Sequence, residues 1–546
     1  MYFWRWAIWK AFEKNDSGPA AVSFITAASW LSGPGFLGLR ALARQHADEI
    51  WVIHLGGEGR GALQDENVFA IQTPVAIVTL IRRGLPDTGS AAKVYYQQLS
   101  GTRDSKLDAL SRVTPPAHED PNWETLEAES EYSPLVPTKH EGAWSSYAAL
   151  TDLFPWQQPG AKYNRAWPIS PDPAVLTQRW NALLDIRENA ARAEAFVTGD
   201  TGRNIYTNVA GLPPIAELRA GQPHRPIVPY AHRSFDRQWT IEDPRLANLE
   251  RPSLWNSRSD RQLYLSTMTT TPLGPGPALT VATAVPDLHH FRGSYGGKDV
   301  IPLYRDSYAL EPNVTGGLLQ HLAEAYARES PPAPEDLTAY IYALLAHPGY
   351  HDRFSAELTM PGPRVPVTAD GSLFDEVADV GRRLLWLQTF ATRYVDEASG
   401  RPRTLPRGPQ IAWVRPVRDI PEDPKDIRFD EGTQTLHVGS GQVSGISQEV
   451  WSFSVSGLPV LQRWLAVRTK LGTGRSTTRS TPLDRIRPQA WLDSWNDELL
   501  ELAYVLTETV AMSSTQTQLL ARVVDGVVLD GAQLPQPTDA SRKPPR

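Results

Sequence analysis

PIVPYAHRSFDRQW, residues 226–239, opens the region around which this chain is organised, and VPDLHHFRGSYGGKDVIPLYR, residues 285–305, closes it. Both ends of this region, Arg225–Arg305, concentrate Arg, aromatic, Gly and Pro residues. The segment between them, Arg261–Ala284, alternates Tyr, Leu, Thr and Val as strands do. The pattern predicts strands held between two clusters rich in loops.

The first cluster places Tyr230, Arg233, Asp236, Arg237 and Trp239 within ten positions. Arg carries a planar fork of donors that suits phosphates and guanine edges, and aromatic rings offer stacking faces. The cluster therefore indicates a nucleic-acid surface. The same residues also fit an ordinary corner of a fold, in which Arg233 or Arg237 pairs with Asp236 and ties a turn beneath a Trp.

Length and composition exclude several classes of site. The chain has 546 residues, of which 41% are hydrophobic and 21% charged, as in a globular protein of several domains. It has no cysteine, which excludes disulfides, Cys-ligated zinc, iron–sulfur clusters and a thiol nucleophile. No apolar run approaches the length of a membrane span, so we expect no membrane partner and a cytoplasmic location.

Charge is distributed unevenly along the chain. The net charge of −7 argues against a generic nucleic-acid binder, and Gly101–Leu150 alone sums to about −5. Leu461–Ala490, in contrast, carries seven basic residues against one acid, Asp484. Because an acidic protein can still present a basic face, this basic segment favours contact with phosphate. A solvated surface loop is the alternative interpretation.

Residues 1–95 predict part of an α/β domain. Residues 36–46 have helical spacing, and apolar runs typical of strands occupy residues 20–26, 49–55 and 74–81. Continuous apolar strands separated by a helix indicate a sheet covered on both faces, although three strands make only part of one. Residues 2–13 (YFWRWAIWKAFE) lack Gly and Pro and are apolar nearly all round, which predicts a buried helix.

The remaining chain divides by composition into an acidic, loop-rich connector at 96–165, two mixed α+β parts at 166–400 and 401–534, and a disordered tail at 535–546. Residues 435–453 predict β-hairpins. Helical patterns occupy residues 172–197, 315–328, 333–345, 373–394, 460–468, 498–510 and 516–524.

Four local motifs resemble those of catalytic or ligand-binding sites, but each lacks a residue, a spacing or a following element that such a site requires. Gly57–Ala62 fits G-x-G-x-x-A after a strand, but no amphipathic helix follows it. Gly293–Asp299 lacks the spacing and the Ser or Thr of a phosphate loop. His289 and His290 beside Asp287 have no further metal ligands nearby, so a structural role is favoured. Val443–Ser447 lacks the G-x-S-x-G pattern of serine hydrolases.

Residues 1–83 resemble the second half of an N6-adenine DNA methyltransferase domain. The segments YFWRWAIWKAFE, VSFITAASWLSGPGFLGLR, EIWVIHLGGEGR and ENVFAIQTPVAIVTLIRR are similar, in this order, to those that follow the catalytic motif in that family. The remainder resembles the C-terminal specificity region of Type ISP restriction–modification enzymes through PIVPYAHRSFDRQW, RPSLWN, PDLHHFRGSYGGKDVIPLY, AYIYALLAHPGYHDRF, SFSVSGLPVLQRWLAVR and ELLELAYVLTETV. The resemblance implies a partial Rossmann-like methyltransferase sheet followed by a mixed α+β target-recognition region.

The chain departs from the family at the catalytic motif, which is Asn- or Asp-Pro-Pro-aromatic. Leu212-Pro213-Pro214-Ile215 lacks both the polar and the aromatic residue. In the family this motif holds the amino group of the flipped adenine. The Gly-rich S-adenosylmethionine segment and the nuclease and helicase regions are absent too. We therefore expect no catalytic residue, no bound cofactor and no metal in this chain alone, with S-adenosylmethionine implied only for a complete family enzyme.

Three hypotheses follow. The chain is a DNA-recognition part of an adenine-specific restriction–modification methyltransferase, or it becomes an active methyltransferase when a separate polypeptide supplies the missing half and covers the exposed sheet edge and residues 2–13. A weaker alternative is a carbohydrate-binding protein with a Trp-rich platform. For the favoured hypothesis the partner is double-stranded DNA. The residues expected to contact it are Arg233, Arg237, Trp239, Arg292, Lys298, Arg463, Arg468, Lys470 and Arg475.

Overall fold

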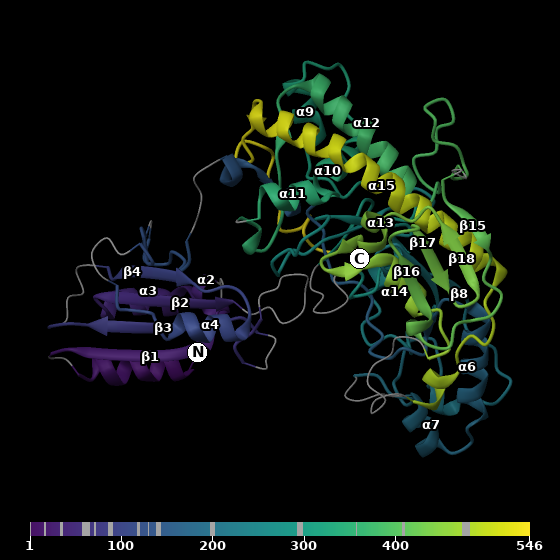
Figure 1. Ribbon diagram of the computed structural model, residues 1–546, viewed down its shortest axis with the longest axis horizontal. Coiled ribbons are helices and arrows are strands. Elements are labelled where there is room, and N and C mark those ends of the chain that lie inside the picture. The colour runs from purple at the N-terminus through teal and green to yellow at the C-terminus, as the bar shows by residue number, and fades with distance from the viewer. Residues whose placement is uncertain are drawn as a thin grey trace. The chain divides into compact units, whose positions relative to one another are not determined.

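A computed structural model gives the structure of the chain, which divides into two compact units, Met1–Gly142 and Ala143–Arg546 (Figure 1). No helix among the described residues is both long enough and apolar enough to cross a membrane. The structure describes residues 2–15, 18–32, 36–56, 66–69, 73–85, 91–116, 121–128, 130–137, 143–196, 202–291, 299–355, 357–406, 410–471 and 481–545.

The first unit is built on a five-stranded sheet with the strand order β1-β3-β2-β4-β5. Neighbouring strands are antiparallel except β2 and β4, which run parallel. The three strands predicted from apolar runs are confirmed as β1, β2 and β3. The elements of this unit are α1 (Tyr2–Ile8), the π-helix η1 (Trp9–Glu13), β1 (Ala20–Ala27), α2 (Ser29–Ser32), α3 (Leu37–His46), β2 (Glu49–Gly56), β3 (Val75–Arg82), β4 (Lys93–Gln98), α4 (Arg103–Leu110) and β5 (Glu124–Leu126).

The sheet of the first unit has one well-covered face. Helices α1 and α3 pack on it through Trp4, Ile8 and Leu39, which join a cluster with Val78 of β3. On the other face the described residues form a smaller cluster, built on Leu55, Val68, Val75 and their neighbours. Within the described residues, the predicted cover is therefore extensive on one face of the sheet and small on the other.

The N-terminal helix is buried on one side only, which corrects the prediction of a helix buried all round. Tyr2 and Phe3 are 92% and 80% exposed, and Trp6 and Trp9 are exposed as well. On the buried side of the helix, Trp4 packs edge-on against Phe24 of β1 at 5.0 Å between ring centroids. Among the described residues no strand pairs with the outer edge of β1.

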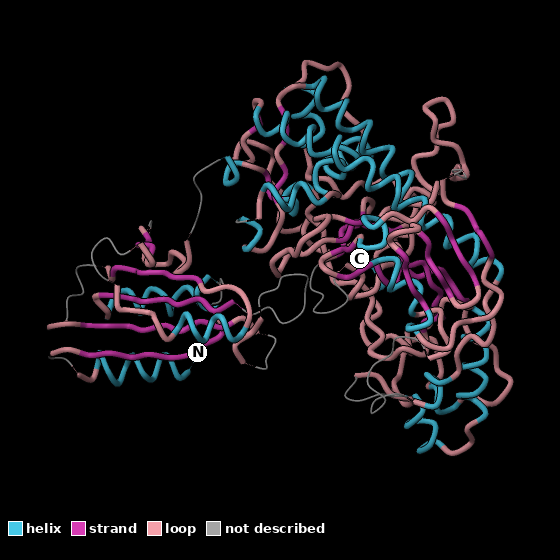
Figure 2. The backbone as a smooth tube through the Cα atoms, in the orientation of Figure 1, coloured by secondary structure: helices cyan, strands magenta, loops and turns pink. Residues whose placement is uncertain are grey.

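The second unit contains many short elements joined by long loops (Figure 2). Its main sheets have the orders β7-β9-β8, β11-β10-β12 and β15-β18-β17-β16. The helices are α5 (Leu150–Leu153), α6 (Pro173–Asp185), α7 (Asn189–Phe196), α8 (Pro252–Asn256), α9 (Leu318–Ala325), α10 (Pro334–Leu345), α11 (Pro348–Arg353), α12 (Gly371–Gln388), α13 (Gln448–Ser452), α14 (Val460–Ala466), α15 (Asp493–Asp525) and the 3-10 turns η3 (Ala143–Ser146), η4 (Ile215–Glu217), η5 (Glu357–Thr359), η6 (Pro424–Asp426) and η8 (Pro482–Arg485). The strands are β6 (Ala148–Ala149), β7 (Ile169–Ser170), β8 (Ile227–Arg233), β9 (Asp236–Ile241), β10 (Tyr264–Ser266), β11 (Thr280–Ala282), β12 (Val300–Pro302), β13 (Arg364–Val365), β14 (Val367–Thr368), β15 (Ala412–Arg415), β16 (Ile427–Asp430), β17 (Thr435–Val438), β18 (Gly441–Ser444), β19 (Ser454–Val455), β20 (Leu458–Pro459) and β21 (Val528–Leu529).

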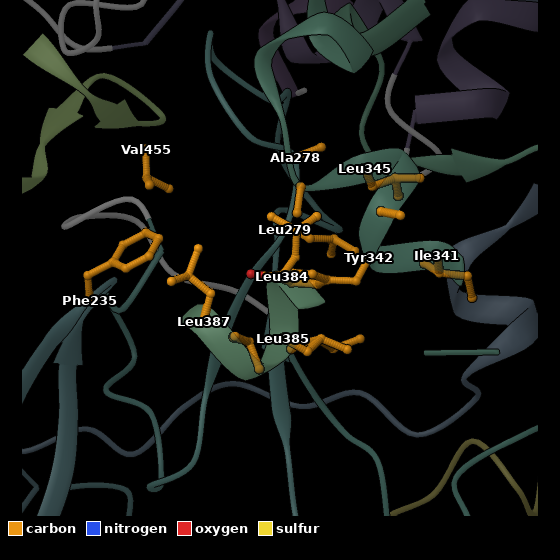
Figure 3. Packing of buried hydrophobic residues seen from close by; sticks show 14 of the residues in the cluster. Phe235, Ala278, Leu279, Ile341, Tyr342, Leu345, Leu384, Leu385, Leu387 and Val455 are labelled. Atoms are coloured by element: carbon orange, nitrogen blue, oxygen red, sulfur yellow. The ribbon is translucent and has the colours of Figure 1, made fainter. Parts of the chain in front are cut away.

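The larger core of the second unit lies between α10, α12 and α15, where α12 and α15 run side by side (Figure 1). Tyr342 of α10 and Leu384 of α12 meet Leu279 at its centre (Figure 3). Gly381 lets α12 approach α10 closely, because a Cβ at this position would lie 1.8 Å from the carbonyl oxygen of Ala339. A second core, containing Trp156, Trp167 and Trp180, lies beneath β8, α6 and α7.

Several sequence predictions for this unit need correction. The helix predicted at 172–197 is two helices, α6 and α7, and the two helices predicted near the C-terminus are one, α15. Residues 448–452 form a helix where a strand was predicted. The tail was predicted to be disordered, yet Arg542 donates to the carbonyl oxygen of Thr151 at 3.0 Å, and Arg305 donates to that of Ser541 at 2.9 Å.

Candidate nucleic-acid interface

The candidate interface is centred on the β8–β9 hairpin, which carries the first Arg and aromatic cluster. In the backbone ladder of the hairpin, Arg233 lies opposite Asp236 across a two-residue turn, Ser234-Phe235. Phe235 has a φ of 64°, a conformation that costs a non-glycine residue energy, and its ring packs edge-on against Phe453. The ladder shifts register between Ala231 and Arg233. This packing fixes the direction in which the side chains at the end of β8 point.

The buried side chain of Arg468 binds the hairpin through Asp236. Its side chain is 0% exposed, and its Nη1 donates to Asp236 Oδ1 at 3.1 Å, while the guanidinium stacks 3.7 Å from the ring centroid of Trp464. Glu498 Oε2 lies 3.5 Å from Nη2. The ion pair expected for Asp236 thus exists, but its partner is Arg468 of the C-terminal region. An arginine buried and paired in this way is not available to phosphate, which corrects the expectation for Arg468.

Arg233 lies at the end of β8 and is only partly buried. Its Nη1 donates to Asp287 Oδ1 at 2.8 Å, and Asp287 in turn accepts from Tyr230 Oη at 2.8 Å. The Nε of Arg233 is buried and has no partner among the described residues. Asp287 therefore holds the head of Arg233 in place and leaves part of its donor capacity unused.

Arg237, Trp239 and Lys470 lie nearer the surface. The guanidinium of Arg237, 45% exposed, stacks 3.7 Å from the ring centroid of Phe390 and donates to Glu501 Oε2 at 2.9 Å. Lys470 pairs with Glu422. Trp239 is half-buried against the second core. Exposed ion pairs of this kind exchange readily with solvent, so Arg237 and Lys470 remain accessible to a ligand.

A pocket of about 310 Å³ opens beside the hairpin. Two of the predicted residues, Arg233 and Arg463, line it together, whereas Arg237, Trp239 and Lys470 lie outside its lining. Lys162 and Arg487 also line the pocket. The predicted residues Arg292, Lys298 and Arg475 lie outside the described residues.

The titratable groups around the hairpin differ in the charge that their shifted pKa values give them at pH 7. Burial acts to raise the pKa of Asp236, but the charge of Arg468 and hydrogen bonds from His232 and Gln238 outweigh it and lower the pKa to about 2. Burial, followed by the charge of Arg233, lowers the pKa of His232 and brings that of His290 to about 3. Both histidines are therefore neutral at pH 7, and the positive charge here belongs to the arginines.

One comparison with known proteins identifies a family. The family model for the Type ISP C-terminal specificity domain matches residues 152–502, which contain the hairpin and the pocket. No curated protein matches the chain.

Solved structures share this fold. The cryo-EM structure of a DrdV–DNA complex has a TM-score of 0.64 and 18% identity, over 95% of this chain and 51% of that chain. A nuclease-deletion mutant of the Type ISP restriction–modification enzyme LlaGI in complex with a DNA substrate mimic gives 0.60 and 15%, over 94% and 42%. The ATP-dependent Type ISP restriction–modification enzyme LlaBIII bound to DNA gives 0.61 and 15%, over 94% and 35%. The chain thus spans about half or less of the length of these proteins.

Proposed function

The chain belongs to the family of the Type ISP C-terminal specificity domain, and from this premise we propose that it recognises duplex DNA sequence as part of a restriction–modification enzyme. The observation that carries the proposal is the grouping of basic side chains at the β8–β9 hairpin, within the matched region of a chain whose net charge is −7. The DNA-bound states of the structurally similar enzymes support the same partner.

Within this proposal, the residues divide by role. Arg237 is exposed, pre-oriented by the Phe390 ring, and has a planar fork that can read a guanine edge. Lys470 contacts phosphate, as do four cations of the pocket: Lys162, Arg233, Arg463 and Arg487. Arg292, Lys298 and Arg475 remain proposed contacts on the basis of their charge and position in the sequence. Arg468 acts as a positioning residue, because it holds the hairpin through Asp236.

The test is binding of the purified chain to a random-sequence duplex pool across a series of salt concentrations. We expect enrichment of one short motif and an affinity that falls steeply as salt rises. An Arg237→Ala variant should relax the base preference at one position and cost about 1–3 kcal/mol of binding free energy.

A matched control for Arg237 is Arg522, an exposed arginine that pairs with Glu376 as Arg237 pairs with Glu501. Arg522→Ala should leave the enriched motif unchanged. A wild-type chain that shows no motif enrichment at any salt concentration would contradict the proposed function.

A second candidate function is adenine methylation after association with a complementary polypeptide. It is favoured by the first unit, where the exposed aromatic face of α1 adjoins the unpaired edge of β1. An exposed strand edge beside apolar side chains is suited to accept a further strand. Strand β2 pairs antiparallel with β3, and the residues described between them, 66–69 and 73–74, contain no helix, whereas a site of the dinucleotide-binding type needs a parallel strand–helix–strand unit. We therefore assign the methyl donor to the partner.

The experiment for this second function mixes the chain with a polypeptide carrying the first half of an N6-adenine methyltransferase domain and measures transfer of labelled methyl groups to duplex DNA. We expect transfer only from the mixture, reduced at least tenfold by Trp6→Glu. The control is Tyr132→Glu, which changes an exposed aromatic residue outside α1. Equal loss in both variants, or no transfer from the mixture, would contradict association through α1.

A further inference from the structure

The pocket beside the β8–β9 hairpin has an excess of positive charge. Its lining comes from separate parts of the second unit: the loop before β7 and β7 itself, helix α6, the β8–β9 hairpin, the loop at 287–289, the region of helix α14, and η8 with the segment after it. Six Lys or Arg side chains line it, against two Asp side chains. The excess is far above the average of the chain, in which acids outnumber bases.

Two of these arginines are structural. Arg165 donates to the carbonyl oxygen of Leu246 at 2.7 Å and stacks on Phe196. Arg179 donates to the carbonyl oxygens of Ile486, Trp167 and Ile169 at 2.8–2.9 Å. The Nη groups of Arg165 and the Nε and Nη1 groups of Arg179 donate to backbone carbonyls, so these two arginines shape the walls of the pocket.

The other four cations retain unused donors. Among the described residues, no carboxylate lies within ion-pair distance of Lys162, Arg463 or Arg487. The Nε atoms of Arg463 and Arg233 are both buried, and neither has a hydrogen-bond partner within the part of the chain that the structure describes. Burial lowers the pKa of Arg463, and the nearby charge of Arg233 lowers it further. Two like charges with unsatisfied buried donors are costly unless an anion lies between them.

The two acids of the pocket offset only part of this excess, because six basic side chains face two carboxylates. Asp287 is engaged by Arg233 and Tyr230. Asp484 is held by the backbone N–H and the hydroxyl of Thr481, at 2.8 and 3.1 Å from its Oδ2. Each carboxylate is thus fixed by its own neighbours.

From these observations we propose that the pocket binds a single phosphate group, held by Arg233 and Arg463 on one side and by Lys162 and Arg487 around it. Guanidinium groups match the geometry of phosphate oxygens, and the ammonium of Lys162 adds a point charge. A pocket of about 310 Å³ accommodates a phosphate with part of the molecule that carries it. The phosphate comes from the DNA backbone or from a free phosphorylated ligand. Assigning it to DNA rests on the proposed function, whereas the phosphate site does not.

The first experiment measures the thermal unfolding midpoint of the full chain during a titration with inorganic phosphate at constant ionic strength. We compare the wild type with Arg463→Gln and Arg487→Gln. The control is Arg485→Gln, which removes an exposed positive charge in η8 outside the pocket lining. We expect phosphate to raise the midpoint of the wild type and the control, and its affinity to fall at least tenfold in both pocket variants.

The second experiment measures duplex-DNA affinity of the same four proteins across a salt series. If the pocket receives a backbone phosphate, Arg463→Gln and Arg487→Gln should each weaken binding about tenfold and reduce the salt slope by about one, unlike Arg485→Gln. Loss of phosphate binding with unchanged DNA affinity would support the site and identify its ligand as a free phosphorylated molecule.

The two experiments distinguish failure of the proposed DNA-binding function from failure of the phosphate site. If the wild type responds to phosphate through Arg463 and Arg487 but binds no DNA, the proposed function fails and the pocket stands. If phosphate has no effect on the wild type, or the same effect on all four proteins, the phosphate site is overturned whether or not DNA binds.

Discussion

At the residue scale, the ion pair between Asp236 and Arg468 joins two parts of the chain that lie far apart in sequence. Both side chains are buried, and the pair connects the β8–β9 hairpin to the turn after α14. Removing one partner of such a pair leaves a buried charge without compensation, which costs much more than an exposed pair contributes. The hairpin therefore depends on a contact that no local sequence pattern reveals.

We predict that Arg468→Met lowers the free energy of unfolding by about 3–5 kcal/mol, because Asp236 then remains charged and buried. Denaturant unfolding measures the loss. The control is Arg522→Met, which breaks the exposed pair with Glu376 and should cost less than about 1 kcal/mol. Equal effects of the two variants would show that the buried pair does not hold the hairpin.

A second residue-scale prediction concerns His290. Burial, followed by the charge of Arg233, lowers its pKa from 6.5 to about 3. Between pH 6.5 and pH 3 the unfolded chain therefore binds a proton that the folded chain does not, so stability falls as pH falls, by about 1.4 kcal/mol per pH unit. His290→Gln should remove this contribution in unfolding measured from pH 7 to pH 4.

The residual pH slope of the His290→Gln variant belongs in part to His347, whose pKa burial lowers to about 4. A slope that is identical in the wild type and in the variant would mean that His290 is not held neutral in the folded state.

At the scale of elements, the contact between α10 and α12 depends on one glycine. A Cβ at Gly381 would meet the backbone of Ala339 at 1.8 Å, so Gly381→Ala must push the two helices apart. We expect a loss of about 1–3 kcal/mol in the free energy of unfolding, even though Ala favours helices. Gly38→Ala in α3 is the control, because a Cβ there meets nothing within 4 Å. It should leave stability unchanged or raise it by up to about 1 kcal/mol.

The sequence predicts an element well when the residues of the element itself determine its structure, and poorly when contacts distant in sequence do. Strands β1 to β3 were predicted because their apolar runs are continuous. Strand β4, KVYYQQ, was missed, because half of its residues are polar and its pairing with β2 is a tertiary contact. Residues 448–452 form a helix capped by Ser447, whose hydroxyl accepts from Val450 N–H at 3.3 Å. That cap was overlooked in a stretch interpreted as strand.

The candidate site was predictable only in part for the same reason. The basic composition of residues 461–490 pointed to Arg463 and its neighbours, and the hairpin cluster pointed to Arg233. Lys162 gives no such indication, because it enters the pocket through a loop distant in sequence from both. Composition also could not separate Arg463, which lines the pocket, from Arg468, five positions later, which is paired in the core.

At the scale of the whole molecule, the hydrophobic clusters separate as the two units do. The clusters built on Trp4 and Leu55 draw residues only from Met1–Gly142, and those built on Trp156 and Tyr342 draw only from Ala143–Arg546. A unit with its own buried core has the main requirement for folding alone. The second unit also contains the hairpin, the pocket and all of residues 152–502, which match the family model.

We therefore predict that a fragment of residues 143–546 folds cooperatively and binds duplex DNA with an affinity within about threefold of the full chain, since removing the first unit removes none of the proposed contacts. Circular dichroism and a DNA titration at fixed salt measure the two properties, and the fragment carrying Arg463→Gln serves as its control. If the fragment folds and binds phosphate as the full chain does but loses DNA, part of the recognition surface must lie in residues 1–142, and the assignment of DNA reading to the second unit alone would be wrong.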